Sequence, residues 1–233
     1  MPTYNILFVG LGKMGFHMAG YLSKNKNFKL FVFNRTKSVE HKWKKKFVAD
    51  SYNFKNDIKF DFIISCLKDD HAVNSFFNKF VKTTNYHKNS IIIDHSTISL
   101  RQIDLLSRSF KQRKLKFLDA PITGGEEGAK KGSLSVMVGG TEQNFNKSKS
   151  IISFYSKSIT HMGKLGSGQL TKFTNQILIC GILYSISEAY LFSKKNNLKL
   201  NLTKSVFKKY KSLQNTIYKK YDTSSLIKSF NDR

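Results

Sequence analysis

Acidic residues, proline and cysteine are scarce in this chain. Its 233 residues include 15 Asp and Glu against 40 Lys and Arg, with only two Pro and two Cys. The two cysteines, Cys66 and Cys180, lie far apart in apolar surroundings and share no CxxC or Cys/His spacing. This pattern excludes a disulfide framework and predicts no metal site. We therefore expect two buried free thiols in the reducing environment of the cytoplasm.

The formal net charge of +25 would suit a nucleic-acid binder, but the distribution of the charge argues against that function. The basic residues are mostly Lys, spread from Lys13 to Lys228 in short clusters such as 44–46, as is typical of solvated helix faces. We expect this positive surface to attract an anionic cofactor and a carboxylate substrate instead of DNA or RNA.

No segment has the pattern of a secretion signal or a membrane span. The N-terminus lacks a basic stretch followed by an apolar run. The longest apolar stretch, Ile177–Ile186, is interrupted by Gly181 and Tyr184, and it is too short to cross a bilayer. We therefore expect no membrane partner.

Short apolar runs rich in Ile, Val and Phe alternate with segments of helical length. The runs are Ile6–Val9, Leu30–Phe33, Phe62–Cys66, Ile91–Asp94, Phe117–Ala120, Ser135–Val138 and Ile159–Met162. Such an alternation predicts an α/β fold with a doubly wound, mainly parallel sheet.

The pattern changes to a helical period after Gly168, and this period continues to Tyr190. Asn196-Asn197 are expected to end that helix, and two more helices are predicted at 203–210 and 213–221. We therefore expect two domains, a sheet domain at 1–163 and a smaller all-helical domain at 164–233.

The run Ile6–Val9 leads directly into a glycine-rich turn with a helical segment behind it. Gly10 permits a tight turn, Gly12 lets the backbone approach a pyrophosphate, and Gly15 lets helix and strand pack closely. This is the GxGxxG motif of a Rossmann domain in the strand-turn-helix context that it requires. The residues expected to bind the dinucleotide are Gly10, Leu11, Gly12, Lys13, Met14 and Gly15.

The second apolar run ends in Asn34-Arg35-Thr36, where an NAD enzyme normally offers a carboxylate to the ribose. Arg35 can instead bind a 2′-phosphate through charge-assisted hydrogen bonds, to which Asn34 and Thr36 can add neutral ones. The same three residues could also form a polar turn that caps the next helix. We expect NADP as the cofactor, with NAD possible.

Four blocks of the chain resemble the β-hydroxyacid dehydrogenase family. They are the glycine turn with its continuation Met18-Ala19, then Asp94–Ser99, Phe117–Gly140 and Gly166–Gln176. The resemblance covers nearly the whole chain. It implies an oxidoreductase that transfers hydride between a nicotinamide and a small 3-hydroxy acid or semialdehyde, of the tartronate semialdehyde or 3-hydroxyisobutyrate type. It also implies a homo-oligomer.

The resemblance assigns proton transfer to Lys172. It implies that Lys172 protonates the carbonyl oxygen during reduction and takes the proton back during oxidation. Lysine suits this role better than arginine, because burial can bring the pKa of an ammonium group toward neutrality. The resemblance implies that either Asn175 or Gln176 holds the substrate, and Gln176 follows Lys172 by one helical turn on the same face.

Thr123-Gly124-Gly125 follow an expected strand and precede a short helical segment, so their backbone amides can face an anion. The resemblance makes that anion the substrate carboxylate. The family more often carries Ser at the position of Thr123.

Residues at the carboxyl ends of two further strands complete the expected site, because an open α/β sheet binds its ligand there. Leu67 and Lys68 are expected on the cofactor side. By resemblance, Thr97 contacts the nicotinamide half of the cofactor, and Ser96 the substrate. His95 is unusual at its position, and we expect a neutral, packed imidazole there.

The chain departs from the family pattern at its C-terminus. Relatives continue for several dozen residues and carry a Lys-Asp-Leu motif whose lysine reaches the cofactor, whereas this sequence stops at Asn231-Asp232-Arg233. The helical domain is therefore expected to be incomplete. The alternative to an active dehydrogenase is a catalytically impaired NADP-binding or interaction protein.

Overall fold

The computed structural model describes residues 4–55, 57–199, 201, 205, 206 and 208. The chain divides into two compact units: residues 1–124 with 128–172, and residues 125–127 with 173–233. The first unit thus continues past residue 163, where the sequence pattern placed the domain boundary. Within this unit, the carboxylate of Asp119 accepts hydrogen bonds from the backbone amides of Gly166 and Gln169.

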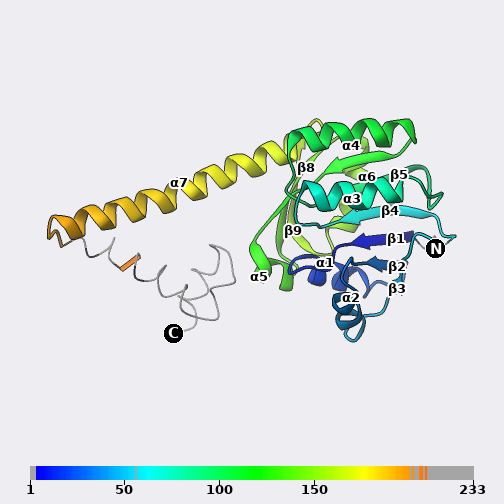
Figure 1. Ribbon diagram of the computed structural model, residues 1–233, viewed down its shortest axis with the longest axis horizontal. Helices are drawn as coiled ribbons and strands as arrows, with labels where there is room; N and C mark the ends of the chain where they lie inside the picture. Colours follow the sequence, from blue (N-terminus) through cyan, green and yellow to red (C-terminus); the bar gives the residue numbers. More distant parts are fainter. Residues whose placement is uncertain (1–3, 56, 200, 202–204, 207, 209–233) are drawn as a thin grey trace. The chain divides into compact units, whose positions relative to one another are not determined.

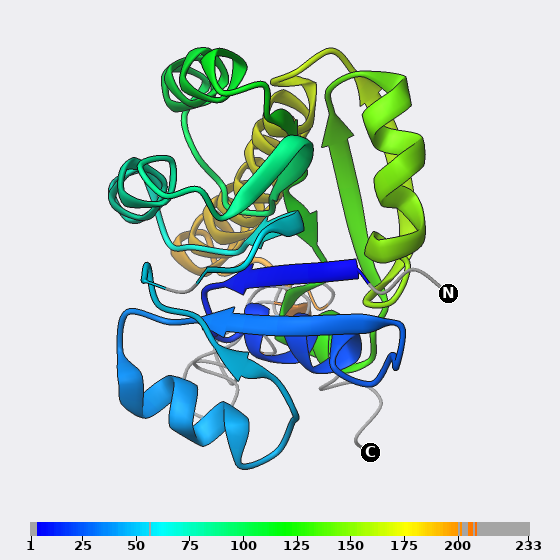
Figure 2. The ribbon, with the colours of Figure 1, turned by 90° about the vertical axis from the view of Figure 1, so that its right-hand side faces the viewer.

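The first unit is built on one nine-stranded sheet (Figures 1 and 2). The strand order is β3-β2-β1-β4-β5-β6-β8-β7, with β9 paired to β8. All pairs are parallel except β6 with β8 and β7 with β8. The strands are β1 (Tyr4–Val9), β2 (Phe28–Phe33), β3 (Asp50–Ser51), β4 (Phe60–Ser65), β5 (Tyr86–Asp94), β6 (Lys116–Asp119), β7 (Ile122–Thr123), β8 (Leu134–Gly139) and β9 (Ser156–Gly163).

All seven predicted strands are present, and the mainly parallel sheet is confirmed. The strands β3 and β7 were not predicted. Each has two residues, which is too short a run to show a period in the sequence.

Helices cover both faces of this sheet, as a doubly wound fold requires (Figure 2). Ile6 and Phe8 of β1 face one core with α1, α2 and α6, whereas Leu7 and Val9 face a second core with α3 and α4. The helices are α1 (Gly15–Leu22), α2 (Lys37–Lys44), α3 (Asp70–Phe80), α4 (Leu100–Gln112), α5 (Gly125–Lys130), α6 (Glu142–Ile152) and α7 (Ser167–Lys195).

The helix α7 is continuous over 29 residues, so the predicted long helix is confirmed. It ends at Lys195, and Asn197 then adopts a left-handed φ of 54°, as the Asn-Asn signal predicted. The helices expected at 203–210 and 213–221 fall almost wholly outside the described residues.

Two expectations about this helix were wrong. The apolar stretch was judged too short to cross a bilayer, but Gly181 and Tyr184 do not interrupt α7, which by length and composition is long enough. A single helix of this kind is weak evidence for a membrane, because core helices meet the same test. Cys180 was expected to be buried, yet it is exposed on α7, whereas Cys66 is partly buried; both thiols are free.

Candidate functional site

The glycine turn after β1 has the geometry that its three glycines predict. Gly10 has a φ of 97°, and a side chain there would meet the backbone oxygen of Cys66. A side chain at Gly15 would collide with the backbone of Gly10. At Gly12, by contrast, an added Cβ meets no described protein atom within 4 Å. The turn is thus closed on its protein side and open at Gly12, which fits the approach of a pyrophosphate.

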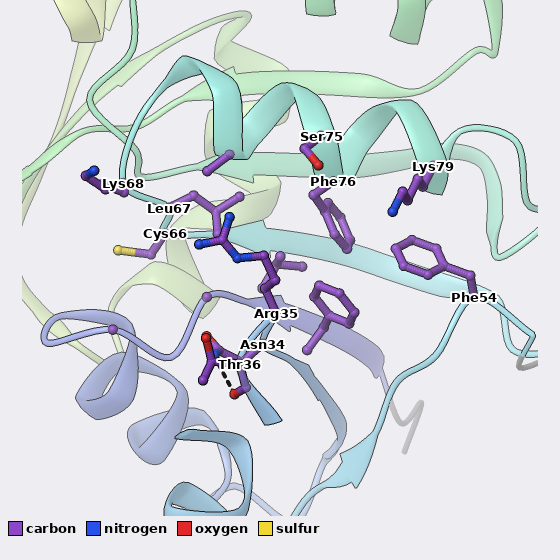
Figure 3. Close-up of a pocket in the computed structure, with 15 residues that line it drawn as sticks. Asn34, Arg35, Thr36, Phe54, Cys66, Leu67, Lys68, Ser75, Phe76 and Lys79 are labelled. Carbon is purple, nitrogen blue, oxygen red and sulfur yellow. Dashed lines mark hydrogen bonds between the residues drawn. The ribbon is translucent and has the colours of Figure 1, made fainter. Parts of the chain in front are cut away.

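Asn34 holds the glycine turn to the end of β2. Its side-chain oxygen accepts a hydrogen bond of 2.9 Å from the backbone nitrogen of Leu11. Its side-chain nitrogen donates one of 2.9 Å to the backbone oxygen of Thr36, which Figure 3 shows. Both ends of the Asn34 amide and the Leu11 amide are therefore engaged within the protein. Asn34 thus has a structural role at this turn, and since it also lines the pocket described below, its contact with a 2′-phosphate stays a prediction.

Arg35 and Thr36 remain exposed beside this anchor. Thr36 occupies the N-cap position of α2, but its hydroxyl makes no capping hydrogen bond. The alternative in which Thr36 serves as a side-chain cap is therefore not supported.

A carboxylate does lie close to the end of β2, although the sequence pattern missed it. Glu40, which is only 1% exposed, accepts a hydrogen bond of 3.2 Å from the backbone nitrogen of Asn34. The same oxygen is 3.0 Å from the ammonium of Lys37. Because this negative charge is buried and paired, it is not presented as a partner for a ribose hydroxyl.

A pocket of about 270 Å³ opens at the carboxyl ends of β1, β2 and β4 (Figure 3). Three phenylalanine rings cluster along it: the centroid of Phe33 lies 5.4 Å from Phe54 and 5.2 Å from Phe76. The residues that line the pocket are Val9, Gly10, Gly12, Phe33, Asn34, Arg35, Thr36, Phe54, Cys66, Leu67, Lys68, Ala72, Ser75, Phe76 and Lys79.

The pocket therefore combines apolar rings with basic side chains. Arg35, Lys68 and Lys79 come from three different segments of the chain and border the same space. Such a pocket suits a flat aromatic group that carries a nearby anion, as the adenosine phosphate part of a dinucleotide does. Phe54 and Lys79 were not expected from the sequence, since they follow no recognisable motif.

The remaining predicted cofactor residues lie nearby. Leu67 and Lys68 line the pocket directly after β4. Lys13 is exposed, and Met14 is half-buried and packs against the core.

The side chain of Lys172, near the start of α7, is held beside the segment that contains Thr123 and Gly124. Its Nζ atom donates a hydrogen bond of 2.9 Å to the backbone oxygen of Ile122, the residue before Thr123. Gly124 has a φ of 119°, which favours glycine at this turn. The structure thus brings together three of the residues that the sequence connected with substrate chemistry.

Ser96 lies deeper than its predicted role requires. It is completely buried; its hydroxyl donates to Asp94 at 2.6 Å and accepts a hydrogen bond of 2.9 Å from the backbone nitrogen of Leu67. It therefore joins the ends of β4 and β5 and does not present a free hydroxyl to a substrate. The neighbouring Thr97, by contrast, is exposed.

Asp119, a buried polar residue that the sequence did not indicate, fixes the start of α7. The Asp119 oxygens accept hydrogen bonds of 2.7 Å from the Gly166 amide and 2.8 Å from the Gln169 amide. Burial raises the pKa of Asp119, and these amide bonds counteract the rise. Residues nearly 50 positions apart meet here, so no local pattern could have revealed the contact.

Gly125, Asn175 and Gln176 belong to the second compact unit. Their part in substrate binding stays a prediction.

His95 is a packed core residue, as expected, and is 2% exposed. Its Nδ1 lies 2.6 Å from the carbonyl oxygen of Ala120, which can only accept, so Nδ1 carries the proton. Its Nε2 then accepts a hydrogen bond of 2.8 Å from the hydroxyl of Tyr155. Burial lowers the pKa of His95 to about 4, and the imidazole is neutral near pH 7.

Residues 5–163 match the family described as the NAD binding domain of 6-phosphogluconate dehydrogenase. The chain is 33% identical over 196 residues to an uncharacterized oxidoreductase of Shewanella frigidimarina, covering 83% of this chain and 67% of that protein. It is 34% identical over 202 residues to a mitochondrial 3-hydroxyisobutyrate dehydrogenase of Drosophila melanogaster, covering 85% and 61%.

The fold is similar to that of a 3-hydroxyisobutyrate dehydrogenase from Mycobacterium tuberculosis, in a structure with L-serine. The TM-score is 0.79 at 23% sequence identity, and the match covers 93% of this chain and 72% of that one. The predicted fold class, a Rossmann-type sheet domain followed by a helical part, is thereby confirmed.

Proposed function

This chain belongs to the β-hydroxyacid dehydrogenases, and we propose that it is an NADP-dependent oxidoreductase. Its motifs and its match to the NAD binding domain of 6-phosphogluconate dehydrogenase both indicate this family. Its substrate is a small 3-hydroxy acid or the corresponding semialdehyde. The observation that carries the proposal is the hydrogen bond of 2.9 Å from Lys172 to Ile122, which fixes an ammonium group beside Thr123 and Gly124.

The reaction combines two transfers. The nicotinamide cofactor, when bound, supplies or accepts the hydride. In reduction, Lys172 donates a proton to the carbonyl oxygen, so that carbonyl, hydride and proton together give the alcohol. In oxidation, the neutral amine of Lys172 takes the hydroxyl proton. Thr123 and Gly124 bind the substrate carboxylate, and Thr97 borders the nicotinamide half.

The preference for NADP is supported by the charges at the end of β2. Arg35 is exposed and lines the pocket, so it can bind a 2′-phosphate. The nearby carboxylate of Glu40 is buried and paired with Lys37. Lys37 therefore compensates the charge of Glu40 toward a phosphate, and Glu40 offers no free partner to a ribose hydroxyl.

The proposal includes self-association through α7. Several large apolar side chains of this helix are exposed, among them Ile177 at 71%, Leu178 at 61% and Phe192 at 62%. Surfaces of this kind are typical of protein interfaces. A second copy of the chain is the partner that the family resemblance favours.

The direct test is turnover with a substrate panel. Purified protein is first titrated with NADPH, and NADPH oxidation is then followed with tartronate semialdehyde, methylmalonate semialdehyde, succinic semialdehyde and glyoxylate. Turnover of at least one substrate is expected. The chain spans only about two thirds of the length of the related proteins from Shewanella frigidimarina and Drosophila melanogaster. Tight NADPH binding without any turnover would favour the alternative, a catalytically impaired NADP-binding protein.

A further inference from the structure

We propose that Gln169 is a positioning residue that fixes the Thr97 turn relative to Lys172, an inference that rests on the function proposed above. In the proposed reaction, Thr97 borders the nicotinamide half of the cofactor and Lys172 transfers the proton. The side chain and the backbone of one buried residue connect the two.

The side-chain amide of Gln169 holds the Thr97 turn from both sides. Its nitrogen donates a hydrogen bond of 2.8 Å to the backbone oxygen of Ser96, and its oxygen accepts one of 3.3 Å from the backbone nitrogen of Ile98. These two groups belong to the residues before and after Thr97. Gln169 itself has no exposed surface. A buried amide whose two ends both bind the backbone fixes the conformation of the turn between them.

The backbone of Gln169 belongs to the helix that carries Lys172. Its amide donates to Asp119 at 2.8 Å, which fixes the first turn of α7 to the end of β6. Lys172 follows three positions later on the same helix, so its side chain leaves α7 on nearly the same face. Its ammonium then binds the oxygen of Ile122 at 2.9 Å. A shift of Gln169 would therefore move Lys172 as well.

This connection matters for the reaction rate, because the rate depends on the distance between the reacting groups. A misplacement of about 1 Å between reacting groups can cost a hundredfold in rate. Removal of the Gln169 amide would leave the Ser96 oxygen and the Ile98 amide without their partner. We expect the Thr97 turn to loosen, while the phosphates of the cofactor are still bound by the glycine turn.

The test compares Gln169→Met with Gln102→Met, in the full chain. Gln102 is a matched control: it is a glutamine of α4 that is 6% exposed, and its side-chain nitrogen has no hydrogen-bond partner among the described residues. Gln169→Met should lower kcat by about tenfold or more, with KM for the substrate and Kd for NADPH changed by less than about threefold. Gln102→Met should leave all three values near wild type.

Two readouts do not depend on turnover. In the protein without cofactor, Gln169→Met should accelerate hydrogen exchange of the Ile98 amide, whereas Gln102→Met should not. With NADPH bound, the fluorescence lifetime of the nicotinamide should change in Gln169→Met only. A third readout uses turnover: the deuterium isotope effect on hydride transfer should increase in the same variant, which a merely structural loss of folded protein would not produce.

The proposal is overturned if Gln169→Met retains wild-type kcat, exchange and lifetime, or if Gln102→Met loses as much as Gln169→Met. Wild-type protein without turnover on any substrate would instead contradict the proposed function. In that case exchange at Ile98 and the lifetime of bound NADPH still decide whether Gln169 positions the turn.

Discussion

The imidazole of His95 and the hydroxyl of Tyr155 form a buried hydrogen bond of 2.8 Å that joins the end of β5 to the segment after α6. The imidazole also donates to the Ala120 carbonyl. The bond that Nε2 accepts from Tyr155 needs the neutral ring, whereas Nδ1 can donate to Ala120 in either protonation state. Protonation would add a charge in a site without solvent, and would remove the acceptor that Tyr155 uses.

This pair predicts a pH dependence of stability. Burial lowers the pKa of His95 to about 4 from 6.5, so the unfolded state binds the proton more readily between these values. The stabilisation by the neutral ring is complete above pH 6.5 and is lost as the pH falls toward 4. It amounts to up to roughly 3 kcal/mol.

The measurement is the free energy of unfolding of wild type and His95→Gln from pH 4 to pH 7. The difference between the two should shrink as the pH falls. Asp94 contributes the opposite slope in both proteins, because burial raises its pKa to about 6. Parallel curves for the two proteins would contradict the neutral assignment of His95.

The NADP preference is tested by Arg35→Asp. Wild type should bind NADPH more tightly than NADH, and the variant should reverse the order, with a change of about tenfold or more, since a hydrogen bond to a charged group contributes about 1.5–3 kcal/mol. Arg108→Asp is the control, because Arg108 is an arginine of α4 that does not line the pocket. Equal affinities for both cofactors in wild type would show that Arg35 does not select them.

The glycine turn gives a prediction that separates binding from folding. Gly12→Val should abolish NADPH binding and leave the thermal midpoint nearly unchanged, because an added Cβ at Gly12 meets no described protein atom within 4 Å. Gly15→Val should unfold the domain, since its side chain would meet the Gly10 backbone. Titration and thermal unfolding of both variants provide the test. Normal NADPH affinity in Gly12→Val would remove this turn from the site.

Self-association through α7 predicts an effect of Leu178→Glu, which places a charge at a residue that is 61% exposed. The variant should shift the oligomer toward monomer in light scattering. Leu105→Glu on α4, at a leucine that is 51% exposed, is the matched control and should retain the wild-type mass. The same monomeric mass for wild type and both variants would rule out this interface.

The sequence predicted those parts of the molecule that depend on local patterns. The seven longer strands follow from runs of apolar residues, and the roles of Gly10 and Gly15 follow from a motif of six residues. The strands β3 and β7 were not predicted, because a run of two residues shows no period.

The connections between distant segments could not be predicted in the same way. The hydrogen bond between Asn34 and Leu11, which lies 23 positions away, was not predicted. Gln169 contacts Ser96 across 73 positions, and Asp119 reaches Gly166 across 47. Such contacts depend on the three-dimensional path of the chain, and polar residues carry no periodic signal that would indicate them.

Proton transfer by Lys172 is tested by the turnover of Lys172→Ala on a semialdehyde that wild type reduces. Turnover should fall by about a hundredfold or more, as is usual for loss of a positioned acid or base, while NADPH affinity stays near the wild-type value. Lys172→Arg should not restore the rate, because guanidinium does not release its proton near neutral pH. An alanine variant that retains most of the wild-type turnover would show that a group other than Lys172 transfers the proton.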